Sequence, residues 1–433
     1  MHLIHRKTCR VCGSSSLTPV INLGDQYLQG SFIKSDRDDP PLRKIPTSLV
    51  RCNPTKDEKA CGLLQMEHSV PPEILYSVYW YRSGTNNTML NHLKEISEEI
   101  SCILPNTQHC TVLDIGCNDG TLLRSYPDSF YKYGVDPSDV ATHIQKDELE
   151  ENICIVQDIF PSAELASRLG GKKCDAITSI AMFYDLEDPV KFVQEVKKIL
   201  APHGIWVFEM SYMPSMLEMN SYDTICHEHL EYYSLSVIEY ILRTADMKIF
   251  NVVLNDINGG SIRCYATHNN NFDYKSETYS KNIRQLRMKE FEMGLDTDRP
   301  YKDFQDRINV HKNNLISLLK RLKKENKKIH IYGASTKGNT ILQWCGIDNR
   351  IIDYAAERNP DKYGAYTLGT EIPIISEQES RAMNPDFYLV LPWHFKSEFM
   401  TREQEILNKG VNFIFPLPNI EIVGSNSPIP IIK

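Results

Sequence analysis

The stretch VLDIGCNDG, residues 112–120, determines how the middle of the chain folds. An apolar strand ends in Asp114, and Gly116 and Gly120 follow it with the spacing GxxxG, with Asn118 between them. Such a tight glycine turn lets the backbone approach a ligand at the carboxyl edge of a parallel sheet. The loop is neither GxGxxG nor GxxxxGKS/T, so it matches a dinucleotide fingerprint and a P-loop poorly.

Polar residues end the next two predicted strands. Asp136 ends YGVD, and Gln157 and Asp158 end CIVQD. A carboxylate at the first position can accept two hydrogen bonds from ribose hydroxyls, and the polar pair could meet an adenine edge. A glycine turn after a strand occurs in many α/β proteins without a ligand, but this order favours a nucleoside site. The pattern resembles the class I fold of methyltransferases that use S-adenosylmethionine (SAM), which implies that the glycine loop meets the amino-acid part of SAM and that Asp136 holds the ribose.

Strands alternate with helices from about residue 85 to residue 270. Apolar residues recur every three or four positions from Met89 to Ile103, as on one face of a helix. Strands separated by helical stretches indicate a doubly wound parallel sheet. The last two strands are joined through DINGG, and we expect a closing hairpin there because Gly-Gly supplies the turn. The expected strands are 111–115, 131–136, 154–158, 176–180, 204–210, 247–255 and 261–268, with an amphipathic helix at 190–200.

The pattern changes three times along the chain, which predicts four parts. Residues 1–80 are irregular, rich in Pro, Gly and polar residues, and are expected to have little core of their own. Residues 81–270 form the methyltransferase-like domain, and residues 271–327 form a polar helical connector with a broken apolar stripe. Residues 328–433 start a second, Rossmann-like unit with its own glycine turn. The predicted fold class is therefore α/β, with a class I SAM methyltransferase domain between a small N-terminal domain and a Rossmann-like C-terminal domain.

The first part contains four cysteines with the spacing of a metal site. Cys9 and Cys12 form a CxxC pair, and Cys52 and Cys61 form a wider one. Four thiolates are typical of structural zinc, and a thin domain would gain stability from such a crosslink. The wide second pair lowers the specificity of this pattern, and four unrelated buried thiols are the alternative. We expect a closed, non-catalytic zinc site that holds the domain as a lid over a substrate pocket.

Composition and charge restrict the function classes. The formal net charge is −8, which disfavours a nonspecific nucleic-acid binder. No apolar run approaches the roughly 20 residues that cross a bilayer, and the start MHLIHRKTCR has no signal-peptide core, so we expect a cytoplasmic protein without membrane contact. Twelve cysteines in 433 residues are too few for a disulfide scaffold, which fits a reducing compartment.

The segment YDTICHEHLEYY, residues 222–233, concentrates ionisable side chains. If it is extended, His227 and His229 point the same way, with Glu228 between them. The pair could ligate a metal, although no further ligand has an obvious spacing, or the segment could be a solvated loop with no role. In the third interpretation His229 is a general base, because imidazole titrates near neutrality, and Glu228 orients a ring or stabilises the imidazolium.

Five motifs in order, MFYDLEDP, FEMSYMP, CHEHLEYYS, NDINGGSIRCY and GASTKGNT, resemble the sugar C-methyltransferase family that makes branched-chain deoxysugars. The resemblance covers nearly the whole chain, and it implies a zinc-binding domain around CRVCG and a Rossmann-like C-terminal domain. It also implies that Glu228 and His229 lie at the active site, with His229 as the base. The tyrosines of YWYRS, Tyr79 and Tyr81, match a segment that the family places near the sugar.

Two positions depart from the family pattern. Cys226 stands where many members have a Tyr before HEH, and Asp185 stands in a loop where many have a His. Hydroxyl or imidazole donors are therefore missing from the expected sugar pocket, and we expect Cys226 to be a small lining residue. The sugar, or even the methylated carbon, could differ from that of better-known members.

The C-terminal unit begins with IHIYGASTKGNTIL, a glycine turn before a helix N-terminus. Backbone donors there can bind an anion, and Lys337 adds positive charge, so the pyrophosphate of a sugar nucleotide is the expected ligand. An NAD site and a unit that only packs are the alternatives, and the loop lacks a third glycine and a clear ribose acid. Trp393 and His394 end a later strand at the same edge and could line the pocket.

These patterns predict an enzyme that uses SAM to methylate a sugar carbon, C3, of a nucleotide-linked 4-ketosugar through a base-generated enolate. The alternatives are an O- or N-methyltransferase acting on a sugar nucleotide, and a non-catalytic protein that binds one. We expect a monomer or a homodimer.

Overall fold

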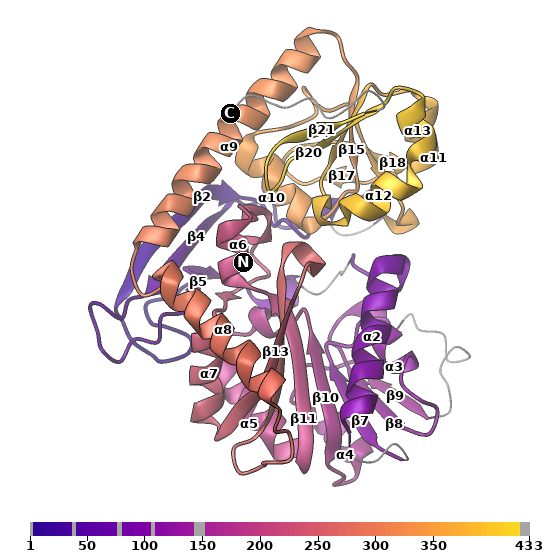
Figure 1. Cartoon of the computed structure of the whole chain (residues 1–433). Helices are drawn as coiled ribbons and strands as arrows, with labels where there is room; N and C mark the ends of the chain where they lie inside the picture. Colours follow the sequence, from indigo (N-terminus) through magenta and orange to yellow (C-terminus); the bar gives the residue numbers. More distant parts are fainter. Residues whose placement is uncertain (1–2, 37–39, 76–79, 105–108, 143–151, 425–433) are drawn as a thin grey trace.

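The computed structural model describes residues 3–36, 40–75, 80–104, 109–142 and 152–424. Two sheet-based units are stacked end to end, with an N-terminal sheet beside their junction (Figure 1). A long helix, α9, runs along the side of the N-terminal sheet and of the C-terminal unit (Figure 1). The three units therefore meet in one region, and the candidate site lies there.

The central unit is the predicted doubly wound sheet. Its seven strands have the order β13-β14-β11-β10-β7-β8-β9, with five parallel strands and an antiparallel hairpin, β13–β14, at one edge. The hairpin turn is the expected one, since Gly259 and Gly260 have φ angles of 84° and 114°. The strands are β7 (Thr111–Ile115), β8 (Tyr131–Val135), β9 (Ile153–Val156), β10 (Cys174–Ile180), β11 (Leu200–Ser211), β13 (Met247–Asn255) and β14 (Ser261–His268).

Alternate residues of these strands pack on opposite faces of the sheet. Val112 faces the core that contains helix α2, while its neighbour Leu113 faces the core that contains α4, α5 and α7. Two buried faces explain why the strands are almost continuously apolar. The helices are α2 (Asn87–Ile103), α3 (Thr121–Arg124), α4 (Ala163–Leu169), α5 (Pro189–Ile199), α6 (Met213–Glu218) and α7 (Leu235–Thr244).

Helix α2 confirms the predicted apolar stripe. The Asn86 side chain caps it by accepting a hydrogen bond from the Thr88 backbone N–H at 2.8 Å. The stripe residues Met89, Leu93, Ile96 and Ile100 are buried against the sheet, and Ile103 at the end of the stripe is partly buried there.

The N-terminal part differs from the irregular domain that the sequence predicted. It contains an antiparallel sheet. The sequence did not reveal these strands, because their apolar residues belong to a core that is shared with other units. Its apolar residues pack on α9 and on the C-terminal unit rather than on one another alone. The strands are β2 (Leu17–Gln26), β4 (Ile45–Cys52) and β5 (Leu64–Met66), and the fourth, β12 (Glu231–Tyr232), comes from the middle of the chain.

The predicted connector consists of two helices, α8 (Glu277–Met293) and α9 (Arg299–Lys324). Every residue of the predicted stripe on α9 is buried, namely Phe304, Ile308, Leu315, Leu319 and Leu322. The buried Arg51 of β4 bonds to the Asp298 carboxylate and to the Asp296 carbonyl, which fixes the start of α9 on the N-terminal sheet.

The C-terminal unit is a six-stranded sheet with the order β18-β16-β15-β19-β20-β21, parallel except for β21. Its strands are β15 (Ile329–Tyr332), β16 (Tyr354–Glu357), β18 (Ile374–Ser376), β19 (Phe387–Val390), β20 (Asn412–Phe415) and β21 (Glu421–Val423). Its helices are α10 (Thr336–Cys345), α11 (Glu377–Ala382), α12 (Lys396–Arg402) and α13 (Gln404–Asn408).

Short elements complete the described chain. They are β1 (Ile4–His5), β3 (Phe32–Ile33), β6 (His68–Ser69), β17 (Tyr366–Thr367) and α1 (Pro72–Leu75). The pairing of β3 with β17 ties the N-terminal part to the C-terminal unit. Within the described ranges, no helix is both long and apolar enough to cross a membrane.

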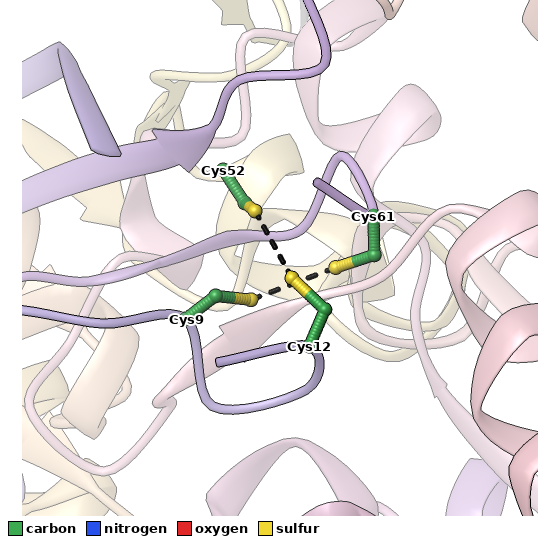
Figure 2. A group of neighbouring side chains, drawn as sticks. All are labelled: Cys9, Cys12, Cys52 and Cys61. Carbon is green, nitrogen blue, oxygen red and sulfur yellow. Dashed lines mark hydrogen bonds between the residues drawn. The ribbon is translucent and has the colours of Figure 1, made fainter. Parts of the chain in front are cut away.

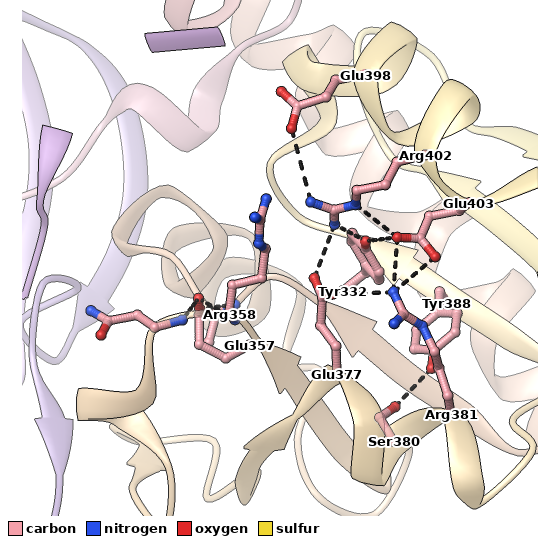
Figure 3. A network of polar contacts seen from close by, with 12 residues as sticks. Tyr332, Glu357, Arg358, Glu377, Ser380, Arg381, Tyr388, Glu398, Arg402 and Glu403 are labelled. Atoms are coloured by element: carbon pink, nitrogen blue, oxygen red, sulfur yellow. Dashed lines mark hydrogen bonds and ion pairs between the residues drawn. The ribbon is translucent and has the colours of Figure 1, made fainter. Parts of the chain in front are cut away.

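A buried ion network joins the helices of the C-terminal unit to its sheet (Figure 3). Glu403 accepts hydrogen bonds from Tyr332, from Arg381 at 2.9 Å and from Arg402 at 2.8 Å. Its side chain is only 3% exposed, so Arg381 and Arg402 share one buried carboxylate, and both also pair with Glu377.

Glu403→Ala should destabilise the protein by about 1–3 kcal/mol, because the Tyr332 hydroxyl and two guanidinium groups lose a buried acceptor, while Glu377 still pairs with both arginines. Glu405→Ala is the matched control: it removes a carboxylate that is 81% exposed, and its cost should stay below about 0.5 kcal/mol. Urea unfolding followed by tryptophan fluorescence measures both. Equal urea midpoints for the two variants would contradict the prediction that Glu403 stabilises the protein more than the exposed Glu405 does.

Candidate active site

One cavity of about 540 Å³ lies where the three units meet. Its wall includes the glycine loop of the central sheet, the 228–229 pair and the start of α10, which are far apart in the sequence. The predicted site residues in the wall are Tyr81, Asp114, Gly116, Asn118, Asp136, Asp158, Asp185, Glu228, His229, Lys337 and His394.

The glycine loop has the backbone that its sequence predicts. Gly116 has a φ angle of 79°, and a Cβ atom there would lie 2.9 Å from Met182 Cγ, so a side chain does not fit. Asn118 is also left-handed, with φ 49°, and its side chain accepts a hydrogen bond from the Ser83 backbone N–H at 3.0 Å. Gly120 is not in the cavity wall; it precedes α3 with φ 73°.

Two carboxylates end neighbouring strands at this edge. Asp114 accepts a hydrogen bond from Thr178 Oγ1 at 2.6 Å, and burial raises its pKa to about 7. Asp136 accepts from the Asn118 backbone N–H at 2.9 Å and from the Ser138 backbone N–H at 2.8 Å. Both side chains are buried against the cavity, where ligand groups can complete their hydrogen bonds.

Of the two residues that were predicted to meet an adenine, only one lines the cavity. Asp158 lies in the cavity wall, whereas Gln157 is exposed outside it and donates from Nε2 to the Ser138 carbonyl at 3.2 Å. Adjacent residues of an extended chain point to opposite sides, which accounts for the difference.

The extended conformation predicted for the HEH segment is wrong, because His227 and Glu228 form a turn. His227 points away from the cavity and contacts Thr47 Oγ1 of the N-terminal sheet through Nε2 at 3.2 Å. Burial lowers its pKa to about 4. The two histidines therefore do not face one ligand, and the proposed HxH metal site is not formed.

His229 is held in one orientation with a free nitrogen. Its Nδ1 lies 2.7 Å from the Thr224 carbonyl oxygen, so Nδ1 carries the proton and Nε2 has the lone pair. The Tyr184 ring packs against it, with 4.2 Å between ring centroids. Burial, aided by the Lys337 ammonium, lowers the pKa of His229 to about 3, so the imidazole is neutral at physiological pH.

Glu228 lies in the cavity wall, and its carboxylate faces Gly30, where no larger residue fits. A Cβ atom on Gly30 would lie 1.9 Å from Glu228 Oε1. Burial raises the pKa of Glu228, while hydrogen bonds from Cys226 and from the Gly30 backbone lower it in part. Cys226 is fully buried and is not in the cavity wall, so the expectation that it lines the pocket is wrong.

The remaining predicted residues differ in their position relative to the cavity. Tyr81 is 48% exposed in its wall, and Tyr79 lies outside the described residues. Lys337 donates to the Asn258 carbonyl at 2.8 Å; burial lowers its pKa, and Asp223 raises it in part. Trp393 lies behind the wall and donates from Nε1 to Asp223 at 2.8 Å.

Several wall residues were missed by sequence reasoning. Glu209, at the end of β11, accepts hydrogen bonds from Arg263 at 2.8 Å and from Asn255 at 2.9 Å. Lys362 donates to the Ala334 carbonyl at 2.7 Å. Glu209 could have been found from its place at a strand end, but Lys362 follows no motif.

The four cysteines of the first part form one cluster (Figure 2). All four Sγ atoms lie within 4.8 Å of one another; Cys9 and Cys61 are 3.5 Å apart, and Cys12 and Cys52 are 3.4 Å apart. A tetrahedral zinc site with bonds of about 2.3 Å requires sulfur separations of about 3.8 Å, so the cluster fits Zn²⁺. None of the four lies in the cavity wall, which indicates a structural metal.

Three family models match the chain in sequence order. A "Putative zinc binding domain" matches residues 9–76, a "Methyltransferase domain" matches 88–252, and a "C-methyltransferase C-terminal domain" matches 256–418. The C-methyltransferase NovU from Streptomyces niveus is 26% identical over 97% of this chain and 98% of its own length.

Solved structures of methyltransferases are also similar to part of this chain. NodS, an N-methyltransferase from Bradyrhizobium japonicum, is 13% identical over 42% of this chain and 98% of its own, with a TM-score of 0.32. ChlM, the magnesium protoporphyrin IX methyltransferase of Synechocystis, is 12% identical over 42% and 82%, also with a TM-score of 0.32.

Replacing Cys12 with Ser should release the zinc and lower the unfolding midpoint by about 5–10 °C, because metal binding and folding of such a site are coupled. Cys102→Ser is the control, since that thiol is exposed on α2 and far from the cluster in sequence. Elemental analysis and thermal unfolding check both variants. Zinc retained at wild-type content in Cys12→Ser would contradict the assignment.

Proposed function

We propose, for a chain that belongs to the SAM-dependent C-methyltransferases, that the substrate is a nucleotide-linked 4-ketosugar and that the methylated atom is its C3. The observation that supports this most strongly is the single cavity that the SAM-type glycine loop, His229 and the start of α10 share. Cofactor, base and anion site thus open onto one space, as transfer between two bound molecules requires.

His229 Nε2 is the proposed base. It is neutral and free to accept a proton, while Nδ1–H donates to the Thr224 carbonyl and that carbonyl can stabilise the imidazolium. A hydrogen on the carbon beside a ketone is acidic enough for such a base if the enolate is stabilised. Glu228, in the same wall, would compensate the positive charge that forms on the ring.

Lys337 is the proposed partner of the substrate pyrophosphate, together with the N-terminus of α10. Its charge also lowers the pKa of His229. A bound anion would offset that charge, so the substrate itself would make His229 a stronger base. This coupling would favour proton removal only in the complex that contains the substrate.

When SAM is bound, it supplies the electrophilic methyl group. Asp136 is the proposed partner of the ribose, while Asp114, Gly116 and Asn118 would face the amino-acid part. Asp158 would face the adenine.

His229→Asn should abolish turnover and also the uptake of solvent deuterium at C3 in the absence of SAM, because both need the same proton removal. Product mass spectrometry with a panel of 4-keto sugar nucleotides and labelled SAM measures turnover. The dissociation constant of SAM should stay within about threefold, since His229 acts on the other reactant.

His227→Asn is the matched control from the same segment. Its ring faces the N-terminal sheet, so turnover should persist even if the unfolding midpoint falls. Full activity in His229→Asn would refute the base. Methylation of an oxygen or nitrogen, without deuterium uptake at carbon, would favour the O- or N-methyltransferase alternative, and a wild-type protein that does not bind SAM would favour a non-catalytic role.

SAM binding should weaken as the pH falls below 7, by up to about tenfold per unit, because Asp114 then becomes protonated and loses its attraction for the cationic ligand. The affinity should level off above pH 8, where Asp114 is a carboxylate. Calorimetric titrations from pH 5.5 to 8.5 check this, with Asp114→Asn as the control that should remove most of the slope.

A further inference from the structure

The cavity contains a second imidazole, supplied by the C-terminal unit. His394 follows β19 in the short turn Trp393–Phe395 and lies in the same wall as His229. Neither of its ring nitrogens has a hydrogen-bond partner among the described residues, and Nδ1 is buried. Buried polar groups are nearly always paired, so an unpaired imidazole in a cavity wall indicates a group that a ligand completes.

The ring of His394 has a rigid support. Phe395 packs on it, with 4.3 Å between ring centroids. Its neighbour Trp393 is held by a hydrogen bond to Asp223, and a Cβ atom on Gly259 would lie 2.9 Å from the Trp393 ring. Because Asp223 immediately precedes Thr224, which orients His229, the two imidazoles are fixed by one connected piece of structure.

Both imidazoles lie within reach of the same ammonium group. Burial, aided by the charge of Lys337, lowers the pKa of both His229 and His394. A neutral imidazole has one N–H to donate. The donors expected at two other positions are lacking: Cys226 stands in place of a tyrosine and is outside the wall, and Asp185 stands in place of a histidine.

We propose that His394 donates a hydrogen bond to the ketone oxygen of the substrate and to the enolate oxygen that develops from it. This rests on the proposed function. His229 Nε2 takes the C3 proton, the C–H electron pair forms the C3–C4 double bond, and the carbonyl π pair moves to oxygen. The C3 carbon then attacks the methyl carbon, the sulfur keeps the electron pair of the broken bond, and the carbonyl re-forms. His394 keeps its proton throughout and stabilises the charge at the oxygen.

The test compares His394→Phe, which removes the donor but keeps a ring, with His394→Gln, which keeps an N–H. The probe is the 4-keto sugar nucleotide that the wild-type enzyme turns over best. We expect His394→Phe to lower both kcat and the rate of deuterium uptake at C3 without SAM by about 10²–10³, with KM within threefold. His394→Gln should recover at least tenfold of that loss.

The control is His203→Phe, an exposed residue outside the cavity wall, which should behave as wild type. Deuterium uptake within threefold of wild type in a folded His394→Phe variant would overturn the proposal, as would a loss confined to KM or a Gln variant no better than Phe. Failure of the proposed function has a different signature: the wild-type enzyme itself would then show no uptake at carbon.

Discussion

The site depends on a loop, residues 221–233, that leaves the central sheet and is held by the other two units. Its last residues, β12, pair with β5 of the N-terminal sheet, and the Thr340 hydroxyl of α10 donates to the Ile225 carbonyl at 3.3 Å. Inside the loop, the hydrogen bond between His229 Nδ1 and Thr224 decides which ring nitrogen faces the cavity. The orientation of His229, the proposed base, is therefore a property of the assembled chain, because no single unit provides all of these contacts.

Much of the central fold was predictable because its inner strands are buried on both faces, and because β7 and β8 are followed by Gly116 and Asp136. The same regularity located Asp114 and Asp136. The N-terminal sheet was not predictable, since its core is shared with α9 and the C-terminal unit, and no local pattern records that. The opposite directions of His227 and His229 follow from a turn whose shape is set by Gln29 and Thr47, far away in the sequence. Gly30 went unnoticed for the same reason: the group that excludes its side chain is Glu228, which comes from another unit.

The electrostatics of the cavity suit a reaction that creates and moves charge. Two imidazoles in its wall are neutral and Lys337 is buried, and burial imposes a free-energy cost on these polar groups in the unliganded protein. An anionic substrate would relieve the cost at Lys337, and a proton from carbon would be accepted at His229. Lys337 and His229 lack full partners in the free protein and would gain them from the bound reactants. In this way a site can favour the reacting complex over the free enzyme.

The zinc cluster, although outside the cavity, is mechanically linked to the base. Arg10, between two of the thiolates, donates to the Met66 carbonyl of β5 at 2.8 Å and lies 3.6 Å from Glu231 of β12. Glu231 is two residues after His229. Zinc bound to Cys9 and Cys12 would hold the turn that contains Arg10. Arg10 in turn contacts β5 and β12, and β12 lies at the end of the loop that contains His229. The four thiolates lie outside the cavity wall, so zinc bound there would act on the proposed base by fixing backbone rather than by touching the substrate.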